Sequence, residues 1–105
     1  MIKLVLADAV SYQKLISSNE SDLTDYRETV DKIDEDILIA LKRRNDISEL
    51  IKKYKKENQI KVEDKIREKK LLENLMKKAK SLKIRVEIIK EIWKIIIEES
   101  KNIQS

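Results

Sequence analysis

Charged side chains at helical spacing are the residues of this sequence that could do chemistry. Arg44 and Lys55 would lie about three turns apart on one face of a helix, because each residue turns the helix by about 100°. Asp64, Arg67 and Glu68 have the i, i+3, i+4 spacing that brings side chains together at the start of a helix. By pattern alone a structural role is the favoured explanation of each set: long cations can snorkel beside a core stripe, and the second set can cap a helix and form a surface ion pair.

Three further polar residues complete the candidates. Ser100 and Gln104 have i, i+4 spacing near the end of the last helical segment, which alone indicates nothing. Arg27 would lie about 25 Å before Arg44 along a helix and be rotated from it by roughly 100°. It therefore cannot reach a site between Arg44 and Lys55 of its own chain, but it could reach the equivalent site of a partner chain whose long helix crosses this one.

The composition excludes several kinds of chemistry. The chain has no Cys and no His, so it has no thiolate metal site, no disulfide and no imidazole base. Ser-His-Asp and Cys-His catalysis are therefore ruled out, and any reaction must use Lys, Arg, Asp, Glu, Ser, Gln or Tyr.

The charge and hydropathy limit the possible binding partners and the cellular location of the chain. The formal net charge of the chain is +4. Residues 1–25 contain two Lys and four acidic residues and so carry −2, which leaves +6 on residues 26–105. A basic chain can bind nucleic acid, an anionic surface or an anionic small molecule. Lys is interspersed with Glu and aromatics are scarce, which argues against nucleic acid. No apolar run is long enough for a membrane, and Leu4–Ala7 is too short for a signal core, so we expect a cytoplasmic protein.

The fold class follows from the absence of Gly and Pro and from the 42% of charged residues, which favour long helices over hairpins. We expect an all-α chain with a partly ordered extension over residues 1–25, which could include a helical turn over residues 9–17, and a domain over residues 26–105. Helices are predicted over Tyr26–Asn58, capped by Thr24 or Asp25 with Glu28 completing a capping box, over Asp64–Ser81 and over Val86–Ile103. Apolar residues including Ile66 are expected to point inward.

The length of the first helix predicts a second copy of the chain. About 32 residues rise roughly 48 Å, whereas a compact domain of about 80 residues is roughly 30 Å wide. Two shorter helices of the same chain cannot cover such a helix. An intertwined homodimer is the simplest way to cover the remaining apolar stripe.

Taken together, residues 26–105 resemble the AroQ-type chorismate mutases, which are all-helical. The resemblance rests on four segments in order: YRETVDKIDEDILIALKRR, ISELIKKYKKEN, the Asp64-Lys65-Ile66-Arg67-Glu68 element, and IIIEESKNIQ. It implies a three-helix subunit with one long helix, a homodimer, and conversion of chorismate to prephenate, without a metal or a cofactor, in phenylalanine and tyrosine biosynthesis. Lys61 stands near a position where the family usually has Pro.

The resemblance also implies a role for each candidate residue. Arg44 clamps one substrate carboxylate, Ser100 assists at a carboxylate, and Arg27 reaches a carboxylate in the partner's site. Lys55 and Gln104 donate hydrogen bonds to the ether oxygen of the breaking bond. Glu68 and the region of Asp64 hold the ring hydroxyl, and Arg67 supports Glu68 and the anionic end of the substrate.

Other functions stay open at this point. A basic helical nucleic-acid binder is permitted by the charge, and a dimeric coiled-coil interaction module is permitted by the near-heptad spacing of the long helix. Within the family, a regulatory or inactive relative, or one domain of a larger enzyme, is a further alternative. Trp93 in an isoleucine-rich third helix favours a globular core over a coiled coil.

Overall fold

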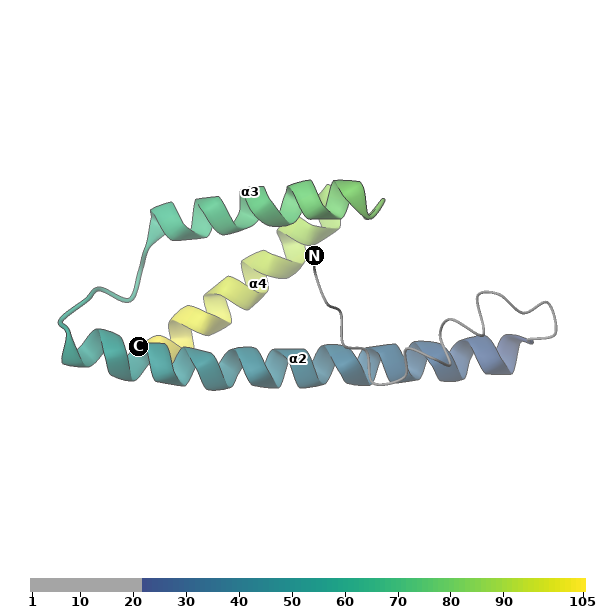
Figure 1. Ribbon diagram of the computed structural model, residues 1–105, viewed down its shortest axis with the longest axis horizontal. Helices are drawn as coiled ribbons and strands as arrows, with labels where there is room; N and C mark the ends of the chain where they lie inside the picture. Colours follow the sequence, from purple (N-terminus) through teal and green to yellow (C-terminus); the bar gives the residue numbers. More distant parts are fainter. Residues whose placement is uncertain (1–21) are drawn as a thin grey trace. The chain divides into compact units, whose positions relative to one another are not determined.

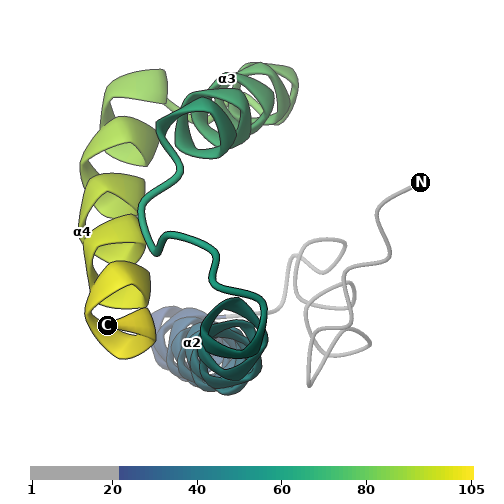
Figure 2. The same cartoon turned by 90° about the vertical axis from the view of Figure 1, so that its left-hand side faces the viewer.

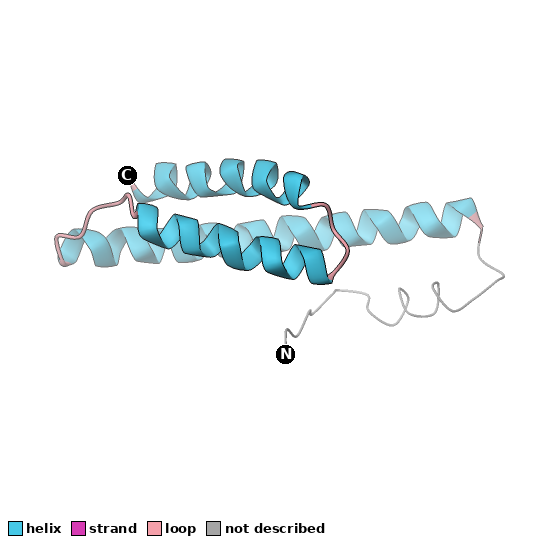
Figure 3. Ribbon diagram, turned by 90° about the horizontal axis from the view of Figure 1, so that it is seen from above, coloured by secondary structure: helices cyan, strands magenta, loops and turns pink. Residues whose placement is uncertain are grey.

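The computed structural model describes residues 22–105, and these residues form three helices and no strand. The helices are α2 (Leu23–Glu57), α3 (Lys65–Ser81) and α4 (Val86–Gln104) (Figures 1 and 3). The all-α prediction is confirmed, and the predicted helices differ from the observed ones by a few residues at their ends. The extension predicted over residues 1–25 lies mostly outside the described residues, and so does the helical turn expected over residues 9–17.

The start of α2 differs from the prediction. The cap is Asp22, whose Oδ1 accepts a hydrogen bond of 3.0 Å from the backbone N–H of Asp25. Asp25 Oδ2 in turn accepts from the backbone N–H of Asp22 at 3.2 Å, which makes a reciprocal capping box. The prediction of Thr24 or Asp25 as the cap, with Glu28, was wrong, because a chain with several capping residues in a row offers more than one register for the same motif.

Two helices end without glycine by the same device. The backbone N–H of Ile60 donates to the Lys55 carbonyl at 2.8 Å, and that of Ile84 donates to the Ala79 carbonyl at 2.8 Å. These are the long bonds of Schellman motifs, which need a residue with positive φ just before the donor. Gln59 (φ 54°) and Lys83 (φ 60°) supply it, so side chains other than glycine occupy the left-handed region at both turns.

The chain divides into two units, residues 1–44 and residues 45–105, with α2 extending through both. In the second unit, α3 and α4 pack against each other, and the buried apolar residues Ala79 and Ile89 come one from each helix. The carboxyl-terminal end of α4 lies next to the last turns of α2 (Figures 1 and 2). Ser48 is buried on this part of α2.

Large apolar side chains remain exposed on all three helices. In the first unit Leu38 is 66% exposed, and in the second unit Leu50 is 63% exposed. Ile66, which was expected to point inward, is 83% exposed, so that prediction was wrong for the single chain. None of the helices within residues 22–105 combines the length and apolarity needed to cross a membrane.

Candidate active site

The loop between α2 and α3 is tied down by Lys55, a predicted catalytic residue. Its ammonium Nζ donates a hydrogen bond of 2.7 Å to the backbone carbonyl of Val62, in a partly buried position. An ammonium group has three N–H donors, so this bond leaves Lys55 with donors for another oxygen. The bond also holds the segment that runs into Asp64.

Asp64 and Arg67 meet at the beginning of α3, as their spacing predicts, but the contact runs through the backbone. Asp64 caps the helix, and its Oδ1 accepts a hydrogen bond of 2.9 Å from the backbone N–H of Arg67. This is the structural role that the spacing alone allowed. The Arg67 side chain is exposed, and Glu68 lies in the first turn, where the helix dipole favours a carboxylate.

Glu68 forms an ion pair with Lys101 across the α3–α4 interface. Lys101 Nζ lies 3.2 Å from Glu68 Oε1, and both side chains are 26% exposed. The same ammonium lies 3.6 Å from carboxylate oxygens of Glu63 and Glu98, which are both more exposed than Glu68. The hydrogen bond to Glu68 is the main cause that raises the pKa of Lys101 above its ordinary value of 10.5, and the negative charges of Glu68, Glu98 and Glu63 add to it. Lys101 is therefore positively charged at neutral pH.

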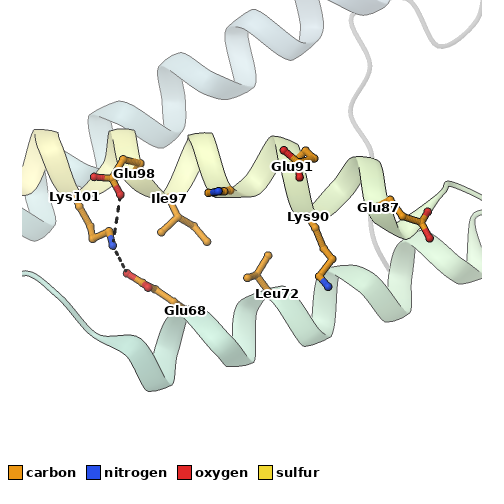
Figure 4. Close-up of a pocket in the computed structure, with 9 residues that line it drawn as sticks. Glu68, Leu72, Glu87, Lys90, Glu91, Ile97, Glu98 and Lys101 are labelled. Carbon is orange, nitrogen blue, oxygen red and sulfur yellow. Dashed lines mark ion pairs between the residues drawn. The ribbon is translucent and has the colours of Figure 1, made fainter.

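A groove of about 520 Å³ runs between α3 and α4, with Glu68 and Lys101 in its lining. Leu72 and Ile97 point into it from the two helices, and charged residues of α4 line it further along (Figure 4). Its apolar middle and charged ends would suit a small amphipathic molecule. Among residues 22–105, no group of three or more Asp or Glu residues could hold a metal ion.

Ser100 and Gln104, on the last turns of α4, are both sheltered from solvent. Ser100 is buried, and its Oγ donates a hydrogen bond of 3.0 Å to the Ile96 carbonyl one turn earlier. Gln104 Oε1 is buried and has no hydrogen-bond partner among residues 22–105. A buried polar atom without a partner is rare in folded proteins, so this oxygen is an acceptor that the described residues do not satisfy.

The two remaining candidates belong to the first unit. Arg27 is exposed near the start of α2, and Arg44 is half-buried further along the same helix. The predicted site residues of the second unit, by contrast, gather at the α2–α3 loop, the first turn of α3 and the last turns of α4: Lys55, Asp64, Arg67, Glu68, Ser100 and Gln104.

Two groups that contact predicted site residues were not predicted from the sequence: the Val62 carbonyl and the Lys101 ammonium. The Val62 carbonyl carries no signal in its residue type, because any residue offers a backbone oxygen. Lys101 directly follows Ser100, and its i, i+3 spacing from Glu98 was visible. One lysine among the 24 basic residues does not stand out, and its pairing with Glu68 depends on how α3 packs against α4.

Residues 22–105 thus form a small all-helical domain whose predicted site residues are cations, carboxylates, a hydroxyl and an amide. The family model for chorismate mutase type II matches residues 26–105. The chain belongs to this family, the AroQ class of chorismate mutases. Family membership assigns it chorismate mutase activity, an isomerase reaction, and chorismate as the substrate. Compared with curated proteins and with solved structures, the chain has no match.

Proposed function

We propose that the chain converts chorismate to prephenate as an intertwined homodimer with two composite sites. The observation that carries the proposal is the family match over residues 26–105, which contains every predicted site residue. The reaction moves the enolpyruvyl group within one molecule, so it requires no nucleophile. It requires a site that holds the dicarboxylate folded and stabilises negative charge growing on the ether oxygen.

In this proposal the cations hold the substrate and the last turns of α4 complete the site. Arg44 clamps one carboxylate with a two-pronged geometry that Lys cannot copy, and Ser100 assists at a carboxylate. Lys55 and Gln104 donate to the ether oxygen. The hydrogen bond from Lys55 to Val62 supports this role, because it keeps the ammonium half-buried without using all its donors.

The carboxylates at the start of α3 take the hydroxyl end of the substrate. Glu68 and the region of Asp64 hold the ring hydroxyl, and Arg67 supports the anionic end. The position of Glu68 in the lining of the groove supports this assignment, since its side chain is only 26% exposed and can accept a hydrogen bond partly shielded from bulk water.

The dimer is supported by the apolar surface that each chain leaves uncovered. Among residues 22–105, Ala79 and Ile89 are the buried apolar residues, whereas large aliphatic side chains of α2 in each unit are more than half exposed. A soluble monomer rarely exposes so many apolar residues along one element. A second copy would cover them and would bring Arg27 to the partner's site. The proposal also locates the enzyme in the cytoplasm, as expected from the sequence.

Subunit complementation tests the composite site. Arg27→Ala and Arg44→Ala homodimers should both be inactive, whereas a heterodimer of the two keeps one intact site of two. A mixture that exchanges subunits should therefore recover up to about a quarter of the parent's chorismate mutase activity. Arg27→Ala mixed with the Arg27→Ala/Arg44→Ala double variant is the control and should recover none. A folded monomer at micromolar concentration in sedimentation, or no recovery in a mixture shown to contain heterodimers, would overturn the proposal.

A further inference from the structure

Lys101 is a cation beside the site to which the family resemblance assigns no role. It follows Ser100 on α4, and its side chain turns toward α3 rather than toward solvent (Figure 4). Its distance to Glu68, 3.2 Å, is the shortest of its three ion pairs. Glu68 is also the least exposed of the three carboxylates, so this pair is the least screened by water.

The geometry leaves Glu68 able to act on a second group. A carboxylate has two oxygens with about four lone-pair positions. Lys101 lies against Oε1, so Oε2 can accept a hydrogen bond from a hydroxyl group in the groove. Arg67, the residue before Glu68, points about 100° away around the helix, whereas Lys101 comes from the facing helix and approaches the carboxylate directly.

We propose that Lys101 is a positioning residue of the mutase: its ammonium holds the Glu68 carboxylate in the α3–α4 groove, oriented to accept the ring hydroxyl of the substrate. The inference rests on the proposed role of Glu68. Glu63, in the loop before α3, and Glu98, on α4, lie 3.6 Å from the same ammonium, so their negative charges favour a cation beside Glu68. The long side chain of Glu68 then enters the reaction already ordered, which lowers the entropy cost of reaching a reactive geometry.

A double-mutant cycle between the two residues tests the inference. Lys101→Met keeps a long apolar side chain but removes the charge, and it should lower kcat/KM by about 3- to 30-fold. Glu68→Gln should lower it at least as much. The double variant should be no worse than Glu68→Gln alone, because Lys101 acts only through Glu68. Lys101→Arg should restore most of the activity, since it keeps a cation that can reach the carboxylate.

Controls separate this role from a general effect of charge or stability. Lys78→Met removes an exposed cation from α3 that lies outside the lining of the groove, and it should leave kcat/KM within about twofold of the parent. Urea unfolding of Lys101→Met must show a folded protein at the assay temperature, and circular dichroism checks its helix content.

Each outcome of the cycle is decisive. If Glu68→Gln is as active as the parent, the proposed role of Glu68 fails and the inference falls with it. If Glu68→Gln loses activity but Lys101→Met does not, only the inference is overturned. If Lys101→Met causes the same loss with and without Glu68→Gln, Lys101 acts on the substrate directly and the positioning role is refuted.

Discussion

Lys55 closes the loop that leads into α3 by donating a 2.7 Å hydrogen bond to the Val62 carbonyl. One side chain therefore links the end of α2 to the segment just before Asp64. The family usually has a Pro in this loop, where Lys61 stands here, and Pro would stiffen the backbone by restricting φ. In this chain the Lys55 bond, together with the Ile60-to-Lys55 backbone bond, restrains the loop.

Lys55→Met should therefore affect both catalysis and the loop. If Lys55 donates to the ether oxygen as proposed, its removal should lower kcat by about 100-fold or more and change KM less, because the charge there develops in the transition state. Loss of the bond to Val62 should lower the free energy of unfolding by about 1 kcal/mol. Steady-state kinetics and urea unfolding measure the two effects. Lys53→Met, an exposed neighbour on the same helix, is the control, and equal behaviour of the two variants would contradict the assignment.

Substitutions of Asp64 separate its capping role from any contact with substrate. Asp64→Ala removes the acceptor for the Arg67 N–H and should cost about 1 kcal/mol of stability. Asp64→Ser keeps a cap and should recover most of that stability. If Asp64 also helps to hold the ring hydroxyl, Asp64→Ser should have a lower kcat/KM than the parent although its unfolding midpoint is close to that of the parent. Full activity in Asp64→Ser would assign the residue to capping alone.

Arg44→Lys tests the carboxylate clamp. The variant keeps the positive charge but loses the planar, two-pronged donor geometry. We expect a loss of about 1–3 kcal/mol of transition-state stabilisation, measured as the ratio of kcat/KM values. Arg43→Lys makes the same change at the exposed neighbouring residue and should have little effect. Near-normal kinetics of Arg44→Lys would refute the clamp.

Gln104→Glu tests the proposed contact of Gln104 with the ether oxygen through the pH dependence of the rate. An ionised carboxylate would repel the negative charge that grows on that oxygen, whereas a protonated carboxyl can still donate. A glutamate ordinarily loses its proton near pH 4.3, so the variant should lose activity as pH rises from about 4.5 to 8, and the parent should vary much less. Equal activity of the variant at pH 5 and pH 8 would show that Gln104 does not touch this oxygen.

Lys83→Gly tests the backbone strain at the turn between α3 and α4. A residue other than glycine at φ 60° costs about 1 kcal/mol, and glycine removes that cost. We expect the variant to raise the free energy of unfolding by about 0.5–1 kcal/mol with unchanged kcat/KM. Lys77→Gly, inside α3, is the matched control and should lower the free energy of unfolding by a similar amount. A loss of stability in Lys83→Gly would contradict the Schellman geometry.

The sequence by itself determined the fold class, the approximate bounds of three helices and the family, because these depend on local periodicity and on residue types at set intervals. The Asp64–Arg67 spacing led directly to the observed cap, since residues three apart on a helix are neighbours whatever surrounds them. The cap of α2 at Asp22 was missed because neighbouring Asp and Thr residues cap equally well in isolation. The pairing of Glu68 with Lys101 and the bond from Lys55 to Val62 were decided only by tertiary structure. The two contacts join residues that are 33 and 7 positions apart in the sequence. The packing of the helices and the loop, rather than any local pattern, sets which of these groups meet.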